Sequence, residues 1–168
     1  NGALEDPFLF EAEVRRIARS RWPGADGGGA EMIDNRERDG IFETEECLHL
    51  IEATTSRTKD KASGDMKKMF SLYEKYRKAS PEKAIKCWFI TREEPTADQR
   101  NARTQIKGAP PNLFNVFSFA AFQASLVDSK AYLGARGDHP FGSIYDPATG
   151  SASVNVPFIE VGIRCVED

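Results

Sequence analysis

The segment Ala84–Thr91 (AIKCWFIT) constrains the fold more than any other part of the chain. It is nearly continuous in apolar and β-prone residues, which is typical of a strand that is covered on both faces. In an α/β fold, helices on both sides of the sheet supply this cover, and helix-like and strand-like segments alternate along this chain. We therefore expect an α/β fold with three layers, in which a central sheet lies between helices.

Helical periodicity precedes this strand in two places. Asp6 and Pro7 form a cap and first-turn pair, and apolar residues then recur at helical spacing from Pro7 to Ser20. The same spacing recurs from Lys59 to Ala79. The other expected elements are a glycine linker at Gly27–Gly29, a strand at Ala30–Asp34, a helix at Thr96–Ile106, a strand at Asn115–Ser118, a helix at about Phe119–Leu133, and closing strands at Val154–Val156 and Phe158–Val166.

Two strand-like runs between the first two helices each deliver a carboxylate. Residues 39–44 and 46–55 predict a hairpin whose first strand begins at Asp39. Because side chains alternate across a strand, Glu52 and Thr54 lie on the same face and emerge together at its end. Mg²⁺ is commonly held by one or two carboxylates, waters and substrate phosphates. Asp39 and Glu52 therefore predict a divalent metal site.

The order of these motifs resembles the PD-(D/E)xK nuclease superfamily, in particular Mrr-like restriction endonucleases and the N-terminal nuclease modules of bacterial antiviral STAND-type NTPases. The resemblance rests on Phe10-Glu11 in the first helix, Arg38-Asp39-Gly40-Ile41, and Ile51-Glu52-Ala53-Thr54 with a helix following. It implies a restriction-endonuclease-like core with a mixed sheet, in which Asp39 and Glu52 bind Mg²⁺ or Mn²⁺ and Glu11 adds a further carboxylate. The implied activity is metal-dependent cleavage of DNA, with double-stranded DNA as the expected substrate, by an effector module in bacterial phage defence.

Position 54 departs from the family pattern, which has a lysine there. That lysine orients the attacking water and stabilises charge in the transition state, whereas Thr54 offers only a neutral hydroxyl. We expect Thr54 to orient water or substrate, and Lys61 to supply the positive charge. Lys61 shares one helix face with Asp65 and Lys68. Lys59 is the second candidate for this role.

Several of these residues also have simpler interpretations. A glutamate in the first turn of a helix is favoured by the helix dipole whatever the function, and this is the preferred interpretation of Glu11. Glu52 follows an apolar run, where burial is costly unless the carboxylate is paired or binds a metal. The alternative is an exposed strand end, at which Glu52 pairs with Arg57 or a helix lysine. His49 faces away from Glu52, so we expect a packed or surface histidine and no general base.

Charge is segregated along the chain, although the net charge is only -3. Residues 1–56 carry six Arg against thirteen Asp or Glu, whereas residues 57–86 carry ten Lys or Arg against four Asp or Glu. An acidic metal site beside a basic face suits an enzyme that holds a cation and a polyanion together. A solvated lysine-rich helix is an equally simple alternative. The residues that we expect to contact nucleic acid are Arg57, Lys59, Lys67 and Lys68.

Residues 1–168 are expected to form a single domain, excised from the N-terminus of a larger protein that carries a C-terminal NTPase or sensor module and self-associates. Three cysteines without ligand spacing predict reduced core thiols, and no apolar run is long enough to span a bilayer, so a cytoplasmic location is expected. The missing lysine leaves a second class open, a catalytically degenerate domain that binds nucleic acid or a protein partner. An RNase is a third, because backbone contacts alone do not distinguish DNA from RNA.

Overall fold

A computed structural model describes residues 5–27, 31–33, 36–126, 145–146 and 151–152. Its contacts divide the chain into two compact units, Asn1–Gln123 and Ala124–Asp168. The second unit contains a short antiparallel pair, β8 (Tyr145–Asp146) and β9 (Ser151–Ala152). The closing strands expected at Val154–Val156 and Phe158–Val166 lie outside the described residues. The part of the helix expected at Phe119–Leu133 that follows residue 126 also lies outside them. The single-domain prediction stays a prediction.

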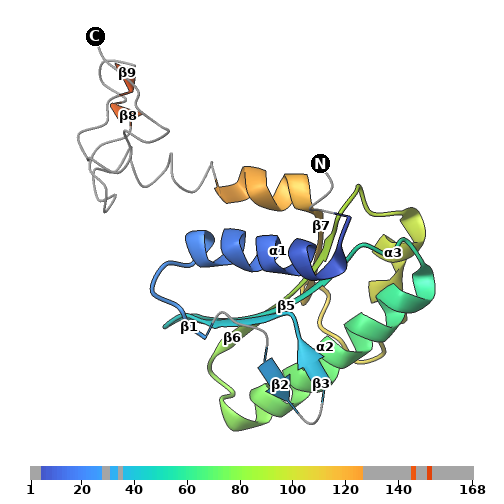
Figure 1. Cartoon of the computed structure of the whole chain (residues 1–168). Coiled ribbons are helices and arrows are strands. Elements are labelled where there is room, and N and C mark those ends of the chain that lie inside the picture. The colour runs from blue at the N-terminus through green and yellow to red at the C-terminus, as the bar shows by residue number, and fades with distance from the viewer. Residues whose placement is uncertain (1–4, 28–30, 34–35, 127–144, 147–150, 153–168) are drawn as a thin grey trace. The chain divides into compact units, whose positions relative to one another are not determined.

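The first unit contains the predicted helices and strands in the predicted order, together with two short strands, Asp26–Gly27 and Arg36–Arg38, that the sequence did not predict (Figure 1). Its elements are α1 (Pro7–Arg21), β1 (Asp26–Gly27), β2 (Glu31–Ile33), β3 (Arg36–Arg38), β4 (Gly40–Glu43), β5 (Cys47–Thr54), α2 (Lys59–Ala79), β6 (Ala84–Thr91), α3 (Ala97–Ala102), the 3-10 helix η2 (Arg103–Gln105) and β7 (Phe114–Ser118). A further helix begins at residue 119. No helix in the described part of the chain combines the length and the apolar character needed to cross a lipid bilayer.

Five strands form one mixed sheet in the order β1-β4-β5-β6-β7. β4 is antiparallel to β1 and to β5, whereas β5, β6 and β7 run parallel. α1 lies on one face of the sheet and α2 on the other (Figure 1). β6 lies inside the sheet and is buried from Cys87 to Thr91, as its composition predicts. The three-layer α/β core with a mixed central sheet is therefore confirmed.

Three sequence predictions differ from the structure in detail. Gly27 does not belong to a linker, because it forms β1 with Asp26 and pairs with Phe42 of β4. Its φ of 86° is a conformation that glycine adopts readily. The strand expected at Ala30–Asp34 exists as β2, but it pairs with β3 in a separate two-stranded sheet. The helix expected at Thr96–Ile106 is shorter, because its last turn is the 3-10 helix η2.

The turn between β4 and β5 contains neither Gly nor Asn and is held by Thr44. The Thr44 N–H donates to the Cys47 carbonyl at 2.9 Å, and the Cys47 N–H donates to Thr44 Oγ1 at 3.0 Å. A threonine side chain can close a turn in this way without a special backbone conformation. The resulting register pairs Gly40 with Ile51, so Asp39 approaches the end of β5.

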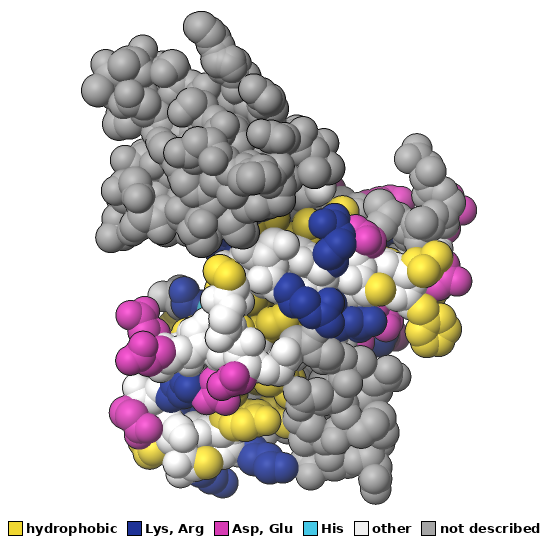
Figure 2. Space-filling view, turned by 60° about the vertical axis from the view of Figure 1, so that its left-hand side comes forward, with side chains coloured by type: hydrophobic (Ala, Val, Ile, Leu, Met, Phe, Trp, Pro, Cys, Tyr) yellow, Lys and Arg dark blue, Asp and Glu magenta, His cyan; other side chains and the backbone are white. Residues whose placement is uncertain are grey.

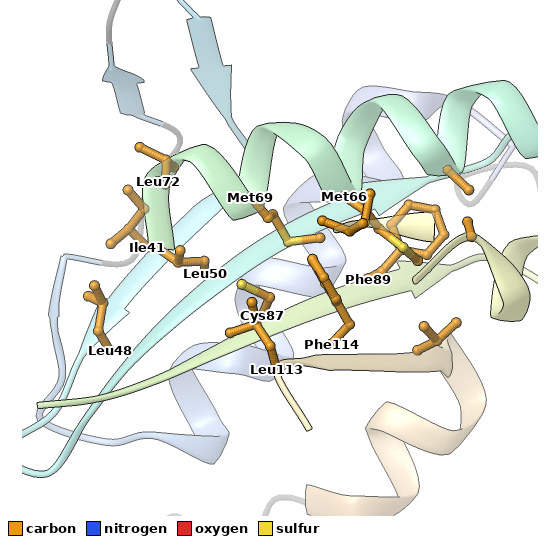
Figure 3. Close-up of a cluster of buried hydrophobic side chains, with 14 residues drawn as sticks. Ile41, Leu48, Leu50, Met66, Met69, Leu72, Cys87, Phe89, Leu113 and Phe114 are labelled. Carbon is orange, nitrogen blue, oxygen red and sulfur yellow. The ribbon is translucent and has the colours of Figure 1, made fainter. Parts of the chain in front are cut away.

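α2 packs on the sheet through the apolar residues Met66, Met69 and Leu72 (Figure 3). These side chains belong to a buried cluster with Leu48 and Leu50 of β5. Both leucines lie on the same face of β5 as Glu52 and Thr54, since side chains alternate along a strand. The apolar face of β5 therefore becomes polar at the carboxyl end of the strand.

The opposite face of β5 carries His49, which packs among aromatic rings. Trp22 stacks on His49 with 3.9 Å between ring centroids, and Trp88 Nε1 donates to His49 Nδ1 at 3.1 Å. His49 is buried, which confirms a packed histidine on the face away from Glu52. This burial, together with the charges of Lys86 and Arg21, lowers the pKa of His49 to about 4.

We predict that acid destabilises the fold through His49. Because the pKa in the folded chain lies below the ordinary value of 6.5, the unfolded chain binds the extra proton between pH 6.5 and about 4. The free energy of unfolding should therefore fall by about 3 kcal/mol across that window. His49→Gln keeps an acceptor for Trp88 but does not titrate. Urea unfolding at pH 7 and pH 4 should show a smaller acid loss for this variant, and equal losses would contradict the prediction.

Candidate active site

The predicted catalytic and metal-binding residues meet in one pocket at the carboxyl end of β5. The pocket has a volume of about 350 Å³. It is lined by Pro7, Phe10 and Glu11 of α1, by Asp39, by Glu52, Ala53, Thr54, Thr55 and Ser56, and by Lys61 and Lys68 of α2. The amino-terminal parts of two helices thus meet the end of a central strand. Ligand sites in open α/β sheets commonly lie outside the carboxyl ends of the strands.

Asp39 is held at this end of β5 by two hydrogen bonds. Its Oδ2 accepts from the Ala53 N–H at 2.6 Å, and its backbone carbonyl accepts from Arg15 Nη1 at 3.1 Å. Burial and the negative charge of Asp65 raise the pKa of Asp39, although the bond from Ala53 and the charges of Lys61 and Arg15 act in the opposite direction. The fold therefore keeps a carboxylate in a place where its negative charge is unfavourable.

Gly40 is required by close packing beside Asp39. A Cβ atom added to Gly40 would lie 2.9 Å from the ring of Phe42 and 3.7 Å from Arg15 Cγ. The Phe42 ring is fully buried and has little room to move. The Asp-Gly pair, a common turn signal in sequences, here places a strand close to α1.

Glu52 and Thr54 are only 3% and 5% exposed. The strand end is therefore buried, and the interpretation of Glu52 as a residue of an exposed strand end is wrong. Arg57, its suggested partner in that interpretation, forms an ion pair with Glu93. Thr54 Oγ1 accepts from the Ser56 N–H at 3.0 Å, so the hydroxyl helps to close the connection to α2.

Lys61 is a cation placed beside the two predicted carboxylates. Its Nζ donates to Asp65 Oδ1 at 3.0 Å. Burial lowers the pKa of Lys61, but the bond to Asp65 and the charges of Asp65, Glu52 and Asp39 outweigh this effect and raise it. Lys61 is therefore charged at neutral pH. Lys59, the second candidate for this role, is exposed and does not line the pocket.

The residues predicted to contact nucleic acid are only partly gathered at the pocket. Lys68 lines it, whereas Lys67 is exposed and lies outside its lining. Arg57 is likewise outside the lining and pairs with Glu93. On the face shown in Figure 2, Lys and Arg side chains lie among Asp and Glu side chains. The segregation of charge along the sequence does not become a continuous basic patch on that face.

The three predicted metal ligands, Asp39, Glu52 and Glu11, all line the pocket. Within the described residues, however, no three His, Cys, Asp or Glu side chains are close enough together to hold one metal ion. Glu11 is the fifth residue of α1 and so lies beyond its first turn, which weakens the dipole explanation for it. Asp39 and Glu52 supply the two hard oxygen donors with which Mg²⁺ combines waters and phosphate oxygens. This donor pair fits Mg²⁺ or Mn²⁺.

Two residues support the site in roles that the sequence did not predict. Gln99 is 1% exposed, and its Nε2 donates to the Ser56 carbonyl at 2.8 Å. The capping box of Thr96 and Gln99, which is visible in the sequence, fixes Gln99 at the start of α3. Asp65 is buried beneath Lys61 and Lys68 and binds both. In the sequence, the spacing of Asp65 from Lys61 and Lys68 was the only signal of this role.

Comparison of the sequence with protein-family models and with curated proteins gives no match.

We predict that Asp39→Asn stabilises the protein at pH 7. Burial makes the charged form of Asp39 less favourable in the folded chain than in the unfolded chain, as the direction of its pKa shift indicates. The asparagine carbonyl oxygen can still accept from the Ala53 N–H. Urea unfolding should therefore show a higher free energy of unfolding for the variant.

The matched control is Glu45→Gln, which neutralises an exposed acidic residue in the turn after β4. It should leave the free energy of unfolding unchanged. A lower free energy for Asp39→Asn than for the unaltered chain would show that the Asp39 charge stabilises the fold.

Proposed function

We propose that this chain is a metal-dependent DNA endonuclease of the PD-(D/E)xK type. The observation that carries the proposal is the convergence of Asp39, Glu52 and the charged Lys61 on one pocket at the end of β5. Asp39 lies directly before β4, Glu52 lies near the end of β5, and Lys61 lies in α2. The order of the two carboxylates is the one that the family resemblance implies, whereas the cation comes from the following helix.

Four residues of the pocket have a role in this proposal. Asp39 and Glu52 would hold Mg²⁺ or Mn²⁺, and such an ion, when bound, supplies an activated water and neutralises charge that develops on a phosphate. Lys61 brings a fixed positive charge toward the substrate phosphate, in place of a lysine at position 54. The Thr54 oxygen already accepts from Ser56, so Thr54 has its hydroxyl proton left to donate to a water or a phosphate oxygen.

The biological setting of the proposal comes from the resemblance. In that setting the chain is a cytoplasmic effector in bacterial phage defence, acts on double-stranded DNA, is fused to a C-terminal NTPase or sensor module, and self-associates so that two active sites can act on one duplex.

A second candidate function is a catalytically degenerate domain that binds nucleic acid or a protein partner. Thr54 favours it, because a hydroxyl whose oxygen is engaged with Ser56 replaces the lysine of the family pattern. Isothermal calorimetry with Mg²⁺ and Mn²⁺ separates the two candidates. Ion binding that is lost in Asp39→Ala supports the enzyme, whereas absence of ion binding, even with DNA present, supports the degenerate domain.

We predict metal-dependent cleavage of plasmid DNA that is reduced on the order of 100-fold or more in Asp39→Ala and Glu52→Ala. Lys61→Ala should lose activity on the order of 100-fold as well, because its charge stabilises the transition state. An RNA of the same sequence, incubated in parallel, decides whether the chain is an RNase. Gel electrophoresis after incubation with Mg²⁺, Mn²⁺ or EDTA provides the measurement.

The matched control is Lys78→Ala, an exposed lysine in the last turn of the same helix, which should retain cleavage within a few-fold. Metal-dependent cleavage that persists unchanged in both carboxylate variants would overturn the site assignment.

A further inference from the structure

Two lysines of α2 share one buried carboxylate beneath the pocket. Lys61 and Lys68 are two helical turns apart, and both line the pocket. Their ammonium groups donate to the same atom, Asp65 Oδ1, at 3.0 and 3.1 Å. The Asp65 side chain is 2% exposed, whereas those of Lys61 and Lys68 are 46% and 33% exposed. The carboxylate therefore lies inside the protein, whereas the two lysine side chains reach its surface.

This arrangement leaves most of the donor capacity of the lysines unused by Asp65. An ammonium group has three N–H donors, and the Asp65 carboxylate takes one from each lysine. The cluster carries two positive charges and one negative charge, so it remains a net cation. A lysine side chain is normally among the most mobile in a protein, and the shared oxygen restrains both of them at once.

Helix stability does not explain why the Asp65 side chain is buried, because burying it is unfavourable. Its second oxygen, Oδ2, is buried and has no hydrogen-bond partner among the described residues. A buried carboxylate with an unsatisfied oxygen costs stability. Its neighbours Met66 and Met69 on the helix belong to the apolar cluster, where an apolar residue would pack without that cost. Departures of this kind from the local rules concentrate at functional sites.

We propose that Asp65 is a positioning residue that holds Lys61 and Lys68 as a two-lysine clamp for a backbone phosphate of nucleic acid. The inference rests on the proposed function, since it assigns the substrate phosphate to the same pocket. Lys61 and Lys68 line the same pocket as Asp39 and Glu52, so a phosphate at the clamp lies beside the carboxylate pair. In the family pattern, the fixed cation is a lysine at position 54 of the strand. In this chain, the clamp on α2 supplies that cation.

The first test measures binding of a short fluorescent DNA duplex in EDTA, where cleavage cannot occur, over a series of salt concentrations. The logarithm of the affinity falls with the logarithm of the salt concentration, with a slope that reflects the number of phosphates neutralised. Lys61→Ala and Lys68→Ala should each weaken binding, and the double variant, which no longer neutralises the shared phosphate, should reduce this slope by about 1. Lys78→Ala, at the far end of the same helix, should leave both the affinity and the slope unchanged.

Asp65→Asn separates a positioning role from a purely electrostatic one, because the two predict opposite signs. Removing a negative charge beside a phosphate site strengthens binding if only the net charge matters. Loss of the shared restraint instead weakens binding, by about tenfold, with an unchanged slope because both lysines remain. In a Lys61→Ala/Lys68→Ala background, Asp65→Asn should have no further effect. An affinity of Asp65→Asn equal to or above that of the unaltered chain would overturn the proposal.

Circular dichroism and thermal unfolding establish that each variant is folded. Should Asp65→Asn fail to fold, the two partly exposed lysines keep the test decisive, since an unchanged affinity in both single alanine variants refutes the clamp. Absence of duplex binding by the unaltered chain in EDTA refutes it as well. Cleavage is scored separately, so that clamp-dependent binding without metal-dependent cleavage would refute the nuclease and retain the clamp.

Discussion

The register of β4 against β5 is the constraint on which the rest of the site depends. Thr44 sets it at the turn, and the hydrogen bond from Ala53 to Asp39 holds it at the other end of the hairpin. A slip by one residue would move every side chain of a strand to the opposite face of the sheet. Leu48 and Leu50 would then lose the apolar cluster beneath α2, so the packing of the core also selects the register that brings Asp39 to the end of β5.

The link between core packing and strand register also explains how a polar site is kept at the edge of a well-packed core. Ion pairs at the surface contribute little to stability, and the pocket is built largely from groups that are buried or anchored to the backbone. Asp39 is tied to Ala53, Thr54 to Ser56, and Ser56 in turn to Gln99 of α3. These bonds leave few degrees of freedom for the side chains, which is the condition for a preorganised site.

The sequence predicted best those parts that local pattern decides. The apolar run of β6 and the periodicity of α2 are each determined by burial, and the structure has both at the expected bounds. β5 is one residue shorter at each end than the predicted 46–55, and it is buried throughout. Contacts between distant segments were not predictable in this way. β1 is only two residues long and exists because it pairs with β4, and the pair of Arg57 with Glu93 joins residues 36 positions apart. In the site, the strand pattern was enough to predict the carboxylates Asp39 and Glu52. The burial of Asp65 could not be predicted, because it depends on how α2 is rotated against the sheet.

The aromatic packing around His49 has a practical consequence for studying this molecule in solution. The chain contains two tryptophans, and both belong to that one cluster, with 5.5 Å between the centroids of Trp22 and Trp88. One comes from the end of α1 and the other from the middle of the sheet, and neither lines the pocket. Intrinsic fluorescence of the unaltered protein is therefore a built-in optical reporter of the docking of α1 on the sheet, and it requires no label near the residues that we propose to bind ions and nucleic acid.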